Sequence, residues 1–303
     1  MEIVKALIPV AGRGTRFLPY TYAIPKEMLP LLNKPAIHYI AHECLRADLK
    51  QIIMVTNKDK STIGDYFEVP IDEEMVKKNP AAAELHKIRR SLTFTYVRQP
   101  EPLGLGHAVL SARHIIGGKE RVAVILPDDF IVSQTPAIAQ LAHLSYQERA
   151  SIIAVQEVPR EAVSAYGIIG IKKQINPSLF QVKDLIEKPK PTEAPSNLAI
   201  VGRYVLSSKI MQALDEVAAD HVDGEIQLTD GIARMLHHNE RVFAYKIQGQ
   251  RYDIGTPVGY VKAMIALALQ DPGLAPHVRE FLHEQDLGMY TQDTKNQPHP
   301  TLF

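Results

Sequence analysis

Short apolar runs that alternate with helical spacing constrain the fold of this chain more than any other feature. Residues 3–9, 51–56 and 122–126 are compact aliphatic runs, and residues 92–97 are rich in β-branched and aromatic side chains. Such runs are typical of buried strands. Between the first two runs, residues 35–47 place apolar side chains at helical spacing. This order predicts an α/β fold with a mostly parallel sheet that helices cover on both faces.

The second half of the chain contains further strand-like runs with fewer helices between them. These runs cover residues 152–158, 167–171, 182–186, 199–206 and 242–247. We expect them to extend the sheet and to add a smaller β-rich lobe. Residues 68–90 are polar with scattered helical spacing and predict a helical insertion on the surface. We expect one main domain over residues 1–270, followed by a helical segment and a polar tail over residues 271–303.

The composition excludes several classes of protein. The chain carries 34 Lys and Arg against 34 Asp and Glu, whereas a protein that wraps nucleic acid usually has a basic excess. Cys44 is the only cysteine, which rules out an internal disulfide and a site of paired zinc ligands. No apolar run is long enough for a membrane span, and no signal-peptide pattern occurs. We therefore expect no nucleic-acid or membrane partner, and the cytoplasm as the compartment.

A glycine-rich turn follows the first predicted strand. It reads AGRGTR over residues 11–16, and Lys26 and Glu27 follow in the segment PKEMLP. Glycines let the backbone approach phosphate groups and turn amide N–H groups toward them. Arg16 and Lys26 add cations that pair with phosphate oxygens. Taken alone, the turn fits a dinucleotide site and a plain tight turn equally well, and its spacing matches neither the P-loop nor the three-glycine dinucleotide pattern.

Two further segments follow the third and fourth predicted strands. The loop QPEPLGLGHA begins at Gln99, whose amide can pair with both a donor and an acceptor on a base edge; a plain strand-to-helix connector is the alternative. Asp128 and Asp129 follow the fourth strand, at the edge where ligands bind in parallel sheets. Two carboxylates there suit Mg²⁺, which takes one or two carboxylates with phosphates and water. Asp is also common in turns and at helix N-termini.

Three later segments allow a binding role and a structural role alike. Glu187 and Lys188 close a predicted strand, and they suit a sugar hydroxyl and a phosphate as well as a surface ion pair. The segment GEIQLTD, residues 224–230, could equally cap and begin a helix. Asp253 lies in the tight turn YDIGTP, where it could bind a metal ion or simply stabilise the turn.

Together these segments resemble one family. The motifs GRGTR with PKEMLP, QPEPLGLGHA, LPDD, YG, EKP, SNLAIVGRY, GEIQLTD and YDIG occur in the order found in the bacterial UTP–glucose-1-phosphate uridylyltransferases, over residues 3–268. The resemblance implies a Rossmann-like sheet with a smaller β-rich, sugar-binding lobe. It implies transfer of the uridylyl group from UTP to α-D-glucose 1-phosphate with Mg²⁺, giving UDP-glucose and pyrophosphate. It also implies a homo-oligomer, either a dimer or a tetramer.

The resemblance assigns a role to each matching residue. The nucleotide-binding residues that it implies are Ala11, Gly12, Gly14, Glu27, Gln99 and Gly104. The catalytic residues are Arg16, Lys26, Asp128 and Lys188. The sugar-binding residues are Gly167, Glu187 and Lys188. The metal ligands are Asp128 and, by match to related thymidylyltransferases, Asp253. Those thymidylyltransferases usually read GDN where this chain reads Pro127-Asp128-Asp129.

On this interpretation the reaction is a direct in-line displacement at the α-phosphorus of UTP. The attacking phosphate oxygen is already an anion, so no general base is needed. The protein has to place two polyanions together and to stabilise the charge of the transition state. Two alternatives are a non-catalytic sensor of UDP-glucose and a nicotinamide dehydrogenase. The combination of Lys26, Asp128 and Lys188 argues against the sensor, and the glycine spacing argues against the dehydrogenase.

Overall fold

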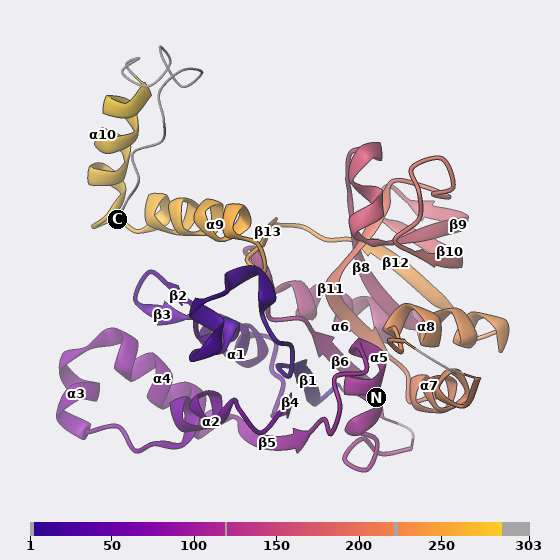
Figure 1. Cartoon of the computed structure of the whole chain (residues 1–303), viewed down its shortest axis with the longest axis horizontal. Helices are drawn as coiled ribbons and strands as arrows, with labels where there is room; N and C mark the ends of the chain where they lie inside the picture. Colours follow the sequence, from indigo (N-terminus) through magenta and orange to yellow (C-terminus); the bar gives the residue numbers. More distant parts are fainter. Residues whose placement is uncertain (1–2, 119, 221–223, 287–303) are drawn as a thin grey trace.

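One sheet of nine strands runs through the described part of the molecule, and helices cover both of its faces (Figure 1). The computed structural model describes residues 3–118, 120–220 and 224–286. The strands of this sheet are β1 (Lys5–Pro9), β4 (Gln51–Thr56), β5 (Thr93–Arg98), β6 (Val122–Ile125), β8 (Ser151–Glu157), β9 (Gly167–Asn176), β10 (Leu179–Glu187), β11 (Leu198–Leu206) and β12 (Val242–Lys246). Their order across the sheet is β5-β4-β1-β6-β11-β8-β12-β10-β9.

Most strands of this sheet point the same way. β1 pairs in parallel with β4 and β6, β4 pairs in parallel with β5, and β8 with β12. β11 and β10 run antiparallel to their neighbours. The predicted α/β fold with a mixed, mostly parallel sheet is confirmed. The chain leaves β1 toward β4 on one side and later adds β6 on the other, which is where such sheets bind ligands.

Alternating strand side chains divide the core into two layers. On β1, Leu7 belongs to one cluster of buried residues, whereas Ala6 and Ile8 belong to the other. Helices that cover the Leu7 cluster are α5 (Leu105–Ser111), α7 (Lys209–Asp220) and α8 (Leu228–His237). Helices that cover the opposite cluster are α1 (Ala36–Arg46), α2 (Ser61–Glu68), α4 (Pro80–Ser91) and α6 (Ala137–Glu148). Full burial of one large aliphatic side chain contributes about 1.5–3 kcal/mol, so both layers stabilise the sheet.

Two short ribbons and two terminal helices complete the architecture. β7 (Asp129–Val132) pairs antiparallel with β13 (Gln250–Asp253), and β2 (Pro30–Leu31) pairs with β3 (Lys34–Pro35). Helix α9 (Pro257–Gln270) packs against β13, and α10 (Ala275–Asp286) packs against α9, so both extend away from the sheet (Figure 1). The remaining elements are α3 (Glu73–Lys78), η1 (Thr15–Phe17), η2 (Tyr20–Tyr22), η3 (Lys26–Met28) and η4 (Arg160–Ala165). Among the described helices, none has the length and hydrophobicity needed to cross a membrane.

The strand-like runs of the sequence match the structure closely. Residues 51–56 form β4 as predicted, and the runs of the second half extend the sheet, with the β9–β10 hairpin at its end as the smaller β-rich part. The predicted helical insertion is present as α3 and α4. Helix α5 ends at Ser111, because Ala112 and Arg113 make turn-type hydrogen bonds to carbonyls three residues earlier. Sequence reasoning did not identify α6, α7 or α9.

Candidate active site

Two cavities open along the carboxyl edge of the sheet, and both are lined by Asp128. The predicted residues that line the first, of about 580 Å³, are Ala11, Gly12, Lys26, Glu27, Gln99, Gly104 and Asp128. The predicted residues that line the second, of about 510 Å³, are Arg16, Asp128, Gly167, Glu187, Lys188 and Asp253. The structure therefore brings together every predicted site residue except Gly14 at two adjoining cavities.

β1 delivers the glycine-rich turn into the first cavity. Ala11 O accepts a hydrogen bond from Asn57 Nδ2 at 3.0 Å, which ties the turn to the segment after β4. A Cβ on Gly12 would lie 3.9 Å from Lys26 Cε, so the backbone there is open to a ligand. Gly14 has φ 67°, and its carbonyl accepts a hydrogen bond from Thr21 Oγ1 at 2.8 Å. Gly14 therefore shapes the turn that begins η1, and its direct contact with a nucleotide stays a prediction.

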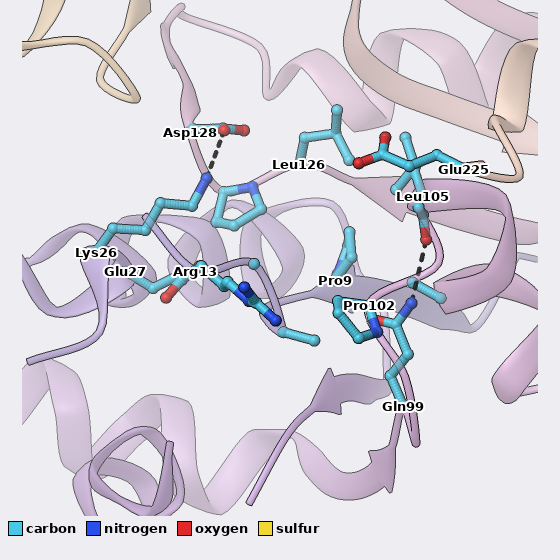
Figure 2. Close-up of a pocket in the computed structure, with 15 residues that line it drawn as sticks. Pro9, Arg13, Lys26, Glu27, Gln99, Pro102, Leu105, Leu126, Asp128 and Glu225 are labelled. Carbon is cyan, nitrogen blue, oxygen red and sulfur yellow. Dashed lines mark hydrogen bonds and ion pairs between the residues drawn. The ribbon is translucent and has the colours of Figure 1, made fainter. Parts of the chain in front are cut away.

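The short helix η3 carries a cation and an anion that pair with different partners. Lys26 Nζ lies 2.7 Å from Asp128 Oδ2 (Figure 2). Burial alone would lower the pKa of Lys26, but the carboxylates of Asp128 and Glu27 outweigh burial and raise this pKa above its usual value. Glu27 is 2% exposed, and its Oε2 accepts a hydrogen bond from Lys60 Nζ at 2.7 Å. Burial raises the pKa of Glu27 despite this ion pair.

The loop after β5 presents the amide that the sequence assigns to base recognition. Gln99 is buried, and its Nε2 donates to Gly104 O at 3.1 Å (Figure 2) and lies 3.1 Å from His107 Nδ1. The amide nitrogen is therefore used within the protein, which leaves the amide oxygen as the group available to a base. Gly106 N donates to Ile226 O at 2.8 Å, so the segment GEIQLTD closes onto this loop.

The two adjacent carboxylates after β6 have different surroundings. Burial would raise the pKa of Asp128, but the Lys26 ammonium outweighs burial and holds this pKa below its usual value. Asp129 is buried, and burial raises its pKa. Its Oδ2 accepts a hydrogen bond from Gly202 N at 2.6 Å, and its Oδ1 accepts one from Arg251. Asp129 therefore fastens the loop to β11 and β13, whereas Asp128 faces both cavities.

The ribbon of β7 and β13 brings Asp253 next to Asp128. Asp253 is in register with Asp129, and Ile254 N donates to Asp128 O at 2.9 Å. A Cβ on Gly255 would lie 3.1 Å from Asp253 Oδ1 and 3.2 Å from Asp128 Oδ2, so both carboxylates lie close to Gly255. Within the described ranges, no group of three or more His, Cys, Asp or Glu side chains could hold a metal ion. Mg²⁺ that is bound by one or two carboxylates and by ligand phosphates does not need such a group.

The second cavity gathers the residues predicted to bind a sugar phosphate. Gly167 of β9 and Glu187 of β10 are paired in register, and Glu187 Oε2 accepts a hydrogen bond from Thr229 Oγ1 at 3.0 Å. The Lys188 side chain is 58% exposed, and its Nζ lies 3.6 Å from Glu187 Oε1. Lys188 has φ 46°, a conformation that few non-glycine residues adopt. Its exposed ammonium can therefore move to a ligand phosphate.

Sequence reasoning missed several residues that support these cavities. Arg251 lines the second cavity, and its guanidinium lies 5.3 Å from the centroid of the Tyr166 ring. Arg203 is fully buried, pairs with Glu43 at 2.8 Å and donates to Leu126 O at 3.0 Å. A charged residue inside an apolar strand run, such as Arg203 in SNLAIVGRY, signals a buried polar partner, because an unpaired buried charge is costly. The sequence therefore signals that Arg203 has a buried partner, but it does not identify Glu43 as that partner.

Comparison of the sequence with known proteins identifies the family of this chain. A sequence profile of the nucleotidyl transferase family matches residues 5–270. The UTP–glucose-1-phosphate uridylyltransferase of Staphylococcus epidermidis is 45% identical over 290 residues, which cover 94% of this chain and 99% of that protein. The chain belongs to the nucleotidyl transferase family. The enzyme of the same name from Staphylococcus haemolyticus is 46% identical over 288 residues, covering 93% of this nucleotidyl transferase and 98% of its relative.

Solved structures show the same fold over nearly the whole chain. A UDP-glucose pyrophosphorylase complexed with UDP-glucose has a TM-score of 0.82 at 38% identity, covering 89% of this nucleotidyl transferase and 100% of that chain. The UTP-bound UGPase from Acinetobacter baumannii has a TM-score of 0.83 at 39% identity, covering 93% and 99%. The described architecture is thus that of UDP-glucose pyrophosphorylases.

Proposed function

We propose that this nucleotidyl transferase moves the uridylyl group of UTP onto the phosphate of α-D-glucose 1-phosphate, which gives UDP-glucose and pyrophosphate. The observation that carries the proposal is the pair of adjoining cavities that meet at Asp128. One is lined by residues suited to a nucleotide and the other by residues suited to a phosphorylated sugar. The staphylococcal relatives, which match this chain almost end to end, are named for the same activity.

The first cavity supports the binding of UTP. The open backbone of Ala11 and Gly12 suits close approach of the phosphates, and the Lys26 ammonium suits the α-phosphate. The Gln99 amide oxygen and the backbone around Gly104 suit the edge of uracil. Arg16 lines the second cavity and therefore suits the phosphates nearest the sugar site. On these grounds we assign the nucleotide to the first cavity, with its phosphates extending toward Arg16 of the second cavity.

The donor set around Asp128 fits Mg²⁺. The Asp128 side chain is 31% exposed, and an oxygen of Asp253 lies near the same Cβ position of Gly255 as Asp128 Oδ2. Two hard carboxylate oxygens together with ligand phosphates are the donors that Mg²⁺ prefers. We assign the ion to Asp128, with Asp253 as the second ligand. When bound, Mg²⁺ would draw charge from the phosphate oxygens. Until ligands arrive, the Lys26 ammonium compensates the Asp128 carboxylate.

The second cavity supports the binding of glucose 1-phosphate and its attack on UTP. We assign Gly167 and Glu187 to the sugar and Lys188 to its phosphate. A phosphate oxygen of the sugar bonds to the α-phosphorus, the bond from that phosphorus to the bridging oxygen breaks, and pyrophosphate leaves. Lys26 and Lys188 neutralise charge on the two sides of the reacting phosphorus. Placement of both reactants can lower the barrier by about 7–11 kcal/mol, and one well-placed donor by about 3–4 kcal/mol.

An initial-rate panel tests the proposal directly. UTP, dTTP, ATP and GTP are each supplied with glucose 1-phosphate or galactose 1-phosphate and Mg²⁺, and pyrophosphate release is measured. We expect the highest rate with UTP and glucose 1-phosphate, and loss of activity with EDTA. No release above a control without sugar phosphate would contradict the proposal. Binding of UDP-glucose without turnover would favour the sensor, and reduction of NAD would favour the dehydrogenase.

The assembly state is a separate prediction that follows from the family resemblance. A homo-oligomer, either a dimer or a tetramer, is expected. Light scattering on the purified full chain measures the molar mass in solution. A mass equal to one chain at micromolar concentration would contradict this prediction without affecting the assignment of the two cavities.

A further inference from the structure

Lys60 lies behind the nucleotide cavity in a buried ion pair. It is 8% exposed, and its Nζ donates to Glu27 Oε2 at 2.7 Å. Glu27 lines the first cavity, and its other oxygen, Oε1, has no hydrogen-bond partner among the described residues. Lys60 is not among the described residues that line either cavity. Glu27 is thus the residue of the cavity wall that Lys60 contacts directly.

The connection from β4 to α2 fastens two parts of the cavity at once. Asn57 Nδ2 holds the carbonyl of Ala11 in the glycine-rich turn at 3.0 Å. Asn57 Oδ1 also accepts from Asp59 N at 3.0 Å, which stiffens the connection as an Asx turn. Lys60 is the N-cap residue directly before α2, and α2 packs against η3. This connection thus sets the position of η3 relative to the glycine-rich turn.

The charges in this corner are balanced in pairs. Lys26 Nζ lies 2.7 Å from Asp128 Oδ2, and Lys60 Nζ lies 2.7 Å from Glu27 Oε2. Burial raises the pKa of Glu27 and lowers the pKa of Lys60, so each of these two groups depends on the other to remain charged. Removing one partner of a buried pair leaves an uncompensated charge. Without Lys60, the nearest cation for Glu27 would be its own neighbour in the chain, Lys26, which also attracts the Glu27 carboxylate.

We propose that Lys60 is a positioning residue for the nucleotide: it engages the Glu27 carboxylate, so that Lys26 stays directed at Asp128 and the α-phosphate. The inference rests on the proposed function, because that function assigns Lys26 to UTP. Gly167, Glu187 and Lys188 line the other cavity. The effect of Lys60 therefore falls on UTP and spares glucose 1-phosphate.

A comparison of Lys60→Met with Lys58→Met in the full chain tests the proposal. Lys58 lies in the same connection but is exposed, so its substitution removes the same charge without breaking a buried pair. We expect Lys60→Met to lower kcat/KM for UTP about tenfold or more, while KM for glucose 1-phosphate stays within about twofold. Lys58→Met should leave both parameters within about twofold. Equal kinetics for Lys60→Met and the parent enzyme would overturn the proposal.

A second arm uses Glu27→Gln and asks whether Lys60 acts through Glu27. When Lys60→Met is added to the Glu27→Gln variant, it removes an ammonium that has already lost its partner, so kcat/KM for UTP should stay within about threefold or improve. A tenfold loss on adding Lys60→Met to that variant would show that Lys60 acts independently of Glu27 and would overturn the proposal. This arm remains decisive if Lys60→Met alone fails to fold.

The outcome for the parent enzyme separates this inference from the proposed function. A parent chain that forms no UDP-glucose contradicts the proposed function. UTP affinities of the same variants, measured by calorimetry, then still decide the role of Lys60. An affinity that falls about tenfold for Lys60→Met and not for Lys58→Met supports it, and equal affinities overturn it.

Discussion

Adjacent residues of this site carry different tasks because their neighbours differ. Lys26 pairs with Asp128, whereas Glu27 pairs with Lys60. Asp128 lines both cavities, whereas both carboxylate oxygens of Asp129 accept hydrogen bonds within the protein, from Gly202 N and from Arg251. Coulomb interactions strengthen at short distance and in poorly solvated surroundings, so a shift of one position along the chain changes which partner dominates. Single substitutions at neighbouring positions should therefore have separable effects.

A substitution at Thr229 tests the assignment of Glu187 to the sugar. Its hydroxyl donates to Glu187 Oε2 at 3.0 Å, and this hydrogen bond orients the carboxylate that we assign to the sugar. Thr229→Val keeps the shape of the side chain and removes the hydroxyl that donates to Glu187. Loss of one such hydrogen bond lowers stability by about 0.5–1.5 kcal/mol. We expect KM for glucose 1-phosphate to rise about fivefold, with KM for UTP within about twofold. Thr229→Ser keeps the hydroxyl and serves as the control. A rise confined to the UTP parameter would contradict the assignment of Glu187.

Gly104 offers a test of the loop that carries Gln99. It has φ 95°, and a Cβ there would lie 2.7 Å from Ile226 O. Gly104→Ala should therefore lower the free energy of unfolding by about 1 kcal/mol or more and weaken UTP binding, because the loop must move. Urea unfolding and UTP titration measure the two effects. Gly118→Ala is the matched control, since among the described residues no atom outside its chain neighbours lies within 4 Å of its Cβ position. Equal behaviour of both variants would contradict this account.

At the scale of elements, one carboxylate fastens the insertion to the core. Glu84 of α4 accepts from Lys34 and lies 3.3 Å from His38 Nε2 of α1, measured from its Oε1. His42 Nδ1 lies 3.4 Å from the same oxygen. Burial alone would raise the pKa of Glu84, but the pairing with Lys34 and His38 outweighs burial and lowers this pKa. The contact between α1 and α4 is therefore strongest when Glu84 is ionised.

Glu84→Gln should lower the free energy of unfolding by about 1–2 kcal/mol at pH 7. The folded-state pKa of Glu84 lies below its unfolded value, so this stabilisation is present above the unfolded pKa, about 4.3. It is lost as pH falls through the folded pKa. The difference between variant and parent, followed by urea unfolding, should therefore shrink below about pH 4. Glu74→Gln, which breaks only the exposed pair with Lys78, should stay within about 0.5 kcal/mol of the parent. A difference that grows with acid would contradict this interpretation.

At the scale of the whole molecule, the two terminal helices differ in what they support. Ala263 and Met264 of α9 pack in a hydrophobic cluster with Phe130 of β7, and β7 begins at the residue after Asp128. Helix α10 contacts α9, and no described residue after Gln270 lines either cavity. The family profile also ends at residue 270. We therefore propose that residues 1–270 form the nucleotidyltransferase domain and that residues 271–303, of which 287–303 lie outside the described residues, are not part of it.

Truncation tests this division. A chain that ends at Gln270 should keep kcat/KM for both substrates within about threefold, because it retains every element that we place at the cavities. A chain that ends at Thr256 loses the helix that packs under the β7–β13 ribbon, and we expect it not to fold cooperatively. Circular dichroism melting and steady-state kinetics distinguish the two. A tenfold loss in the longer truncation would show that residues 271–303 contribute to the site.

Part of this fold and part of this site can be predicted from the sequence. Runs such as residues 51–56 identify buried strands because burial on both faces demands continuous apolar residues. The glycine-rich turn and LPDD can be predicted to lie at the site because each follows such a strand. Helix α9 is apolar nearly all round, so its sequence lacks the periodicity that identifies a helix. The partners of buried charges were also out of reach. Lys60 lies 33 positions from Glu27, and Arg251 lies 122 positions from Asp129, and only the fold brings them together.

The rate of UDP-glucose formation by Asp128→Asn, with saturating UTP, glucose 1-phosphate and Mg²⁺, tests the central claim most directly. The asparagine keeps the size of the side chain and removes the charge at which the two cavities meet. We predict that kcat falls about 10²–10³-fold or more while the fold, followed by circular dichroism, is unchanged. A kcat within about threefold of the parent enzyme would contradict the account.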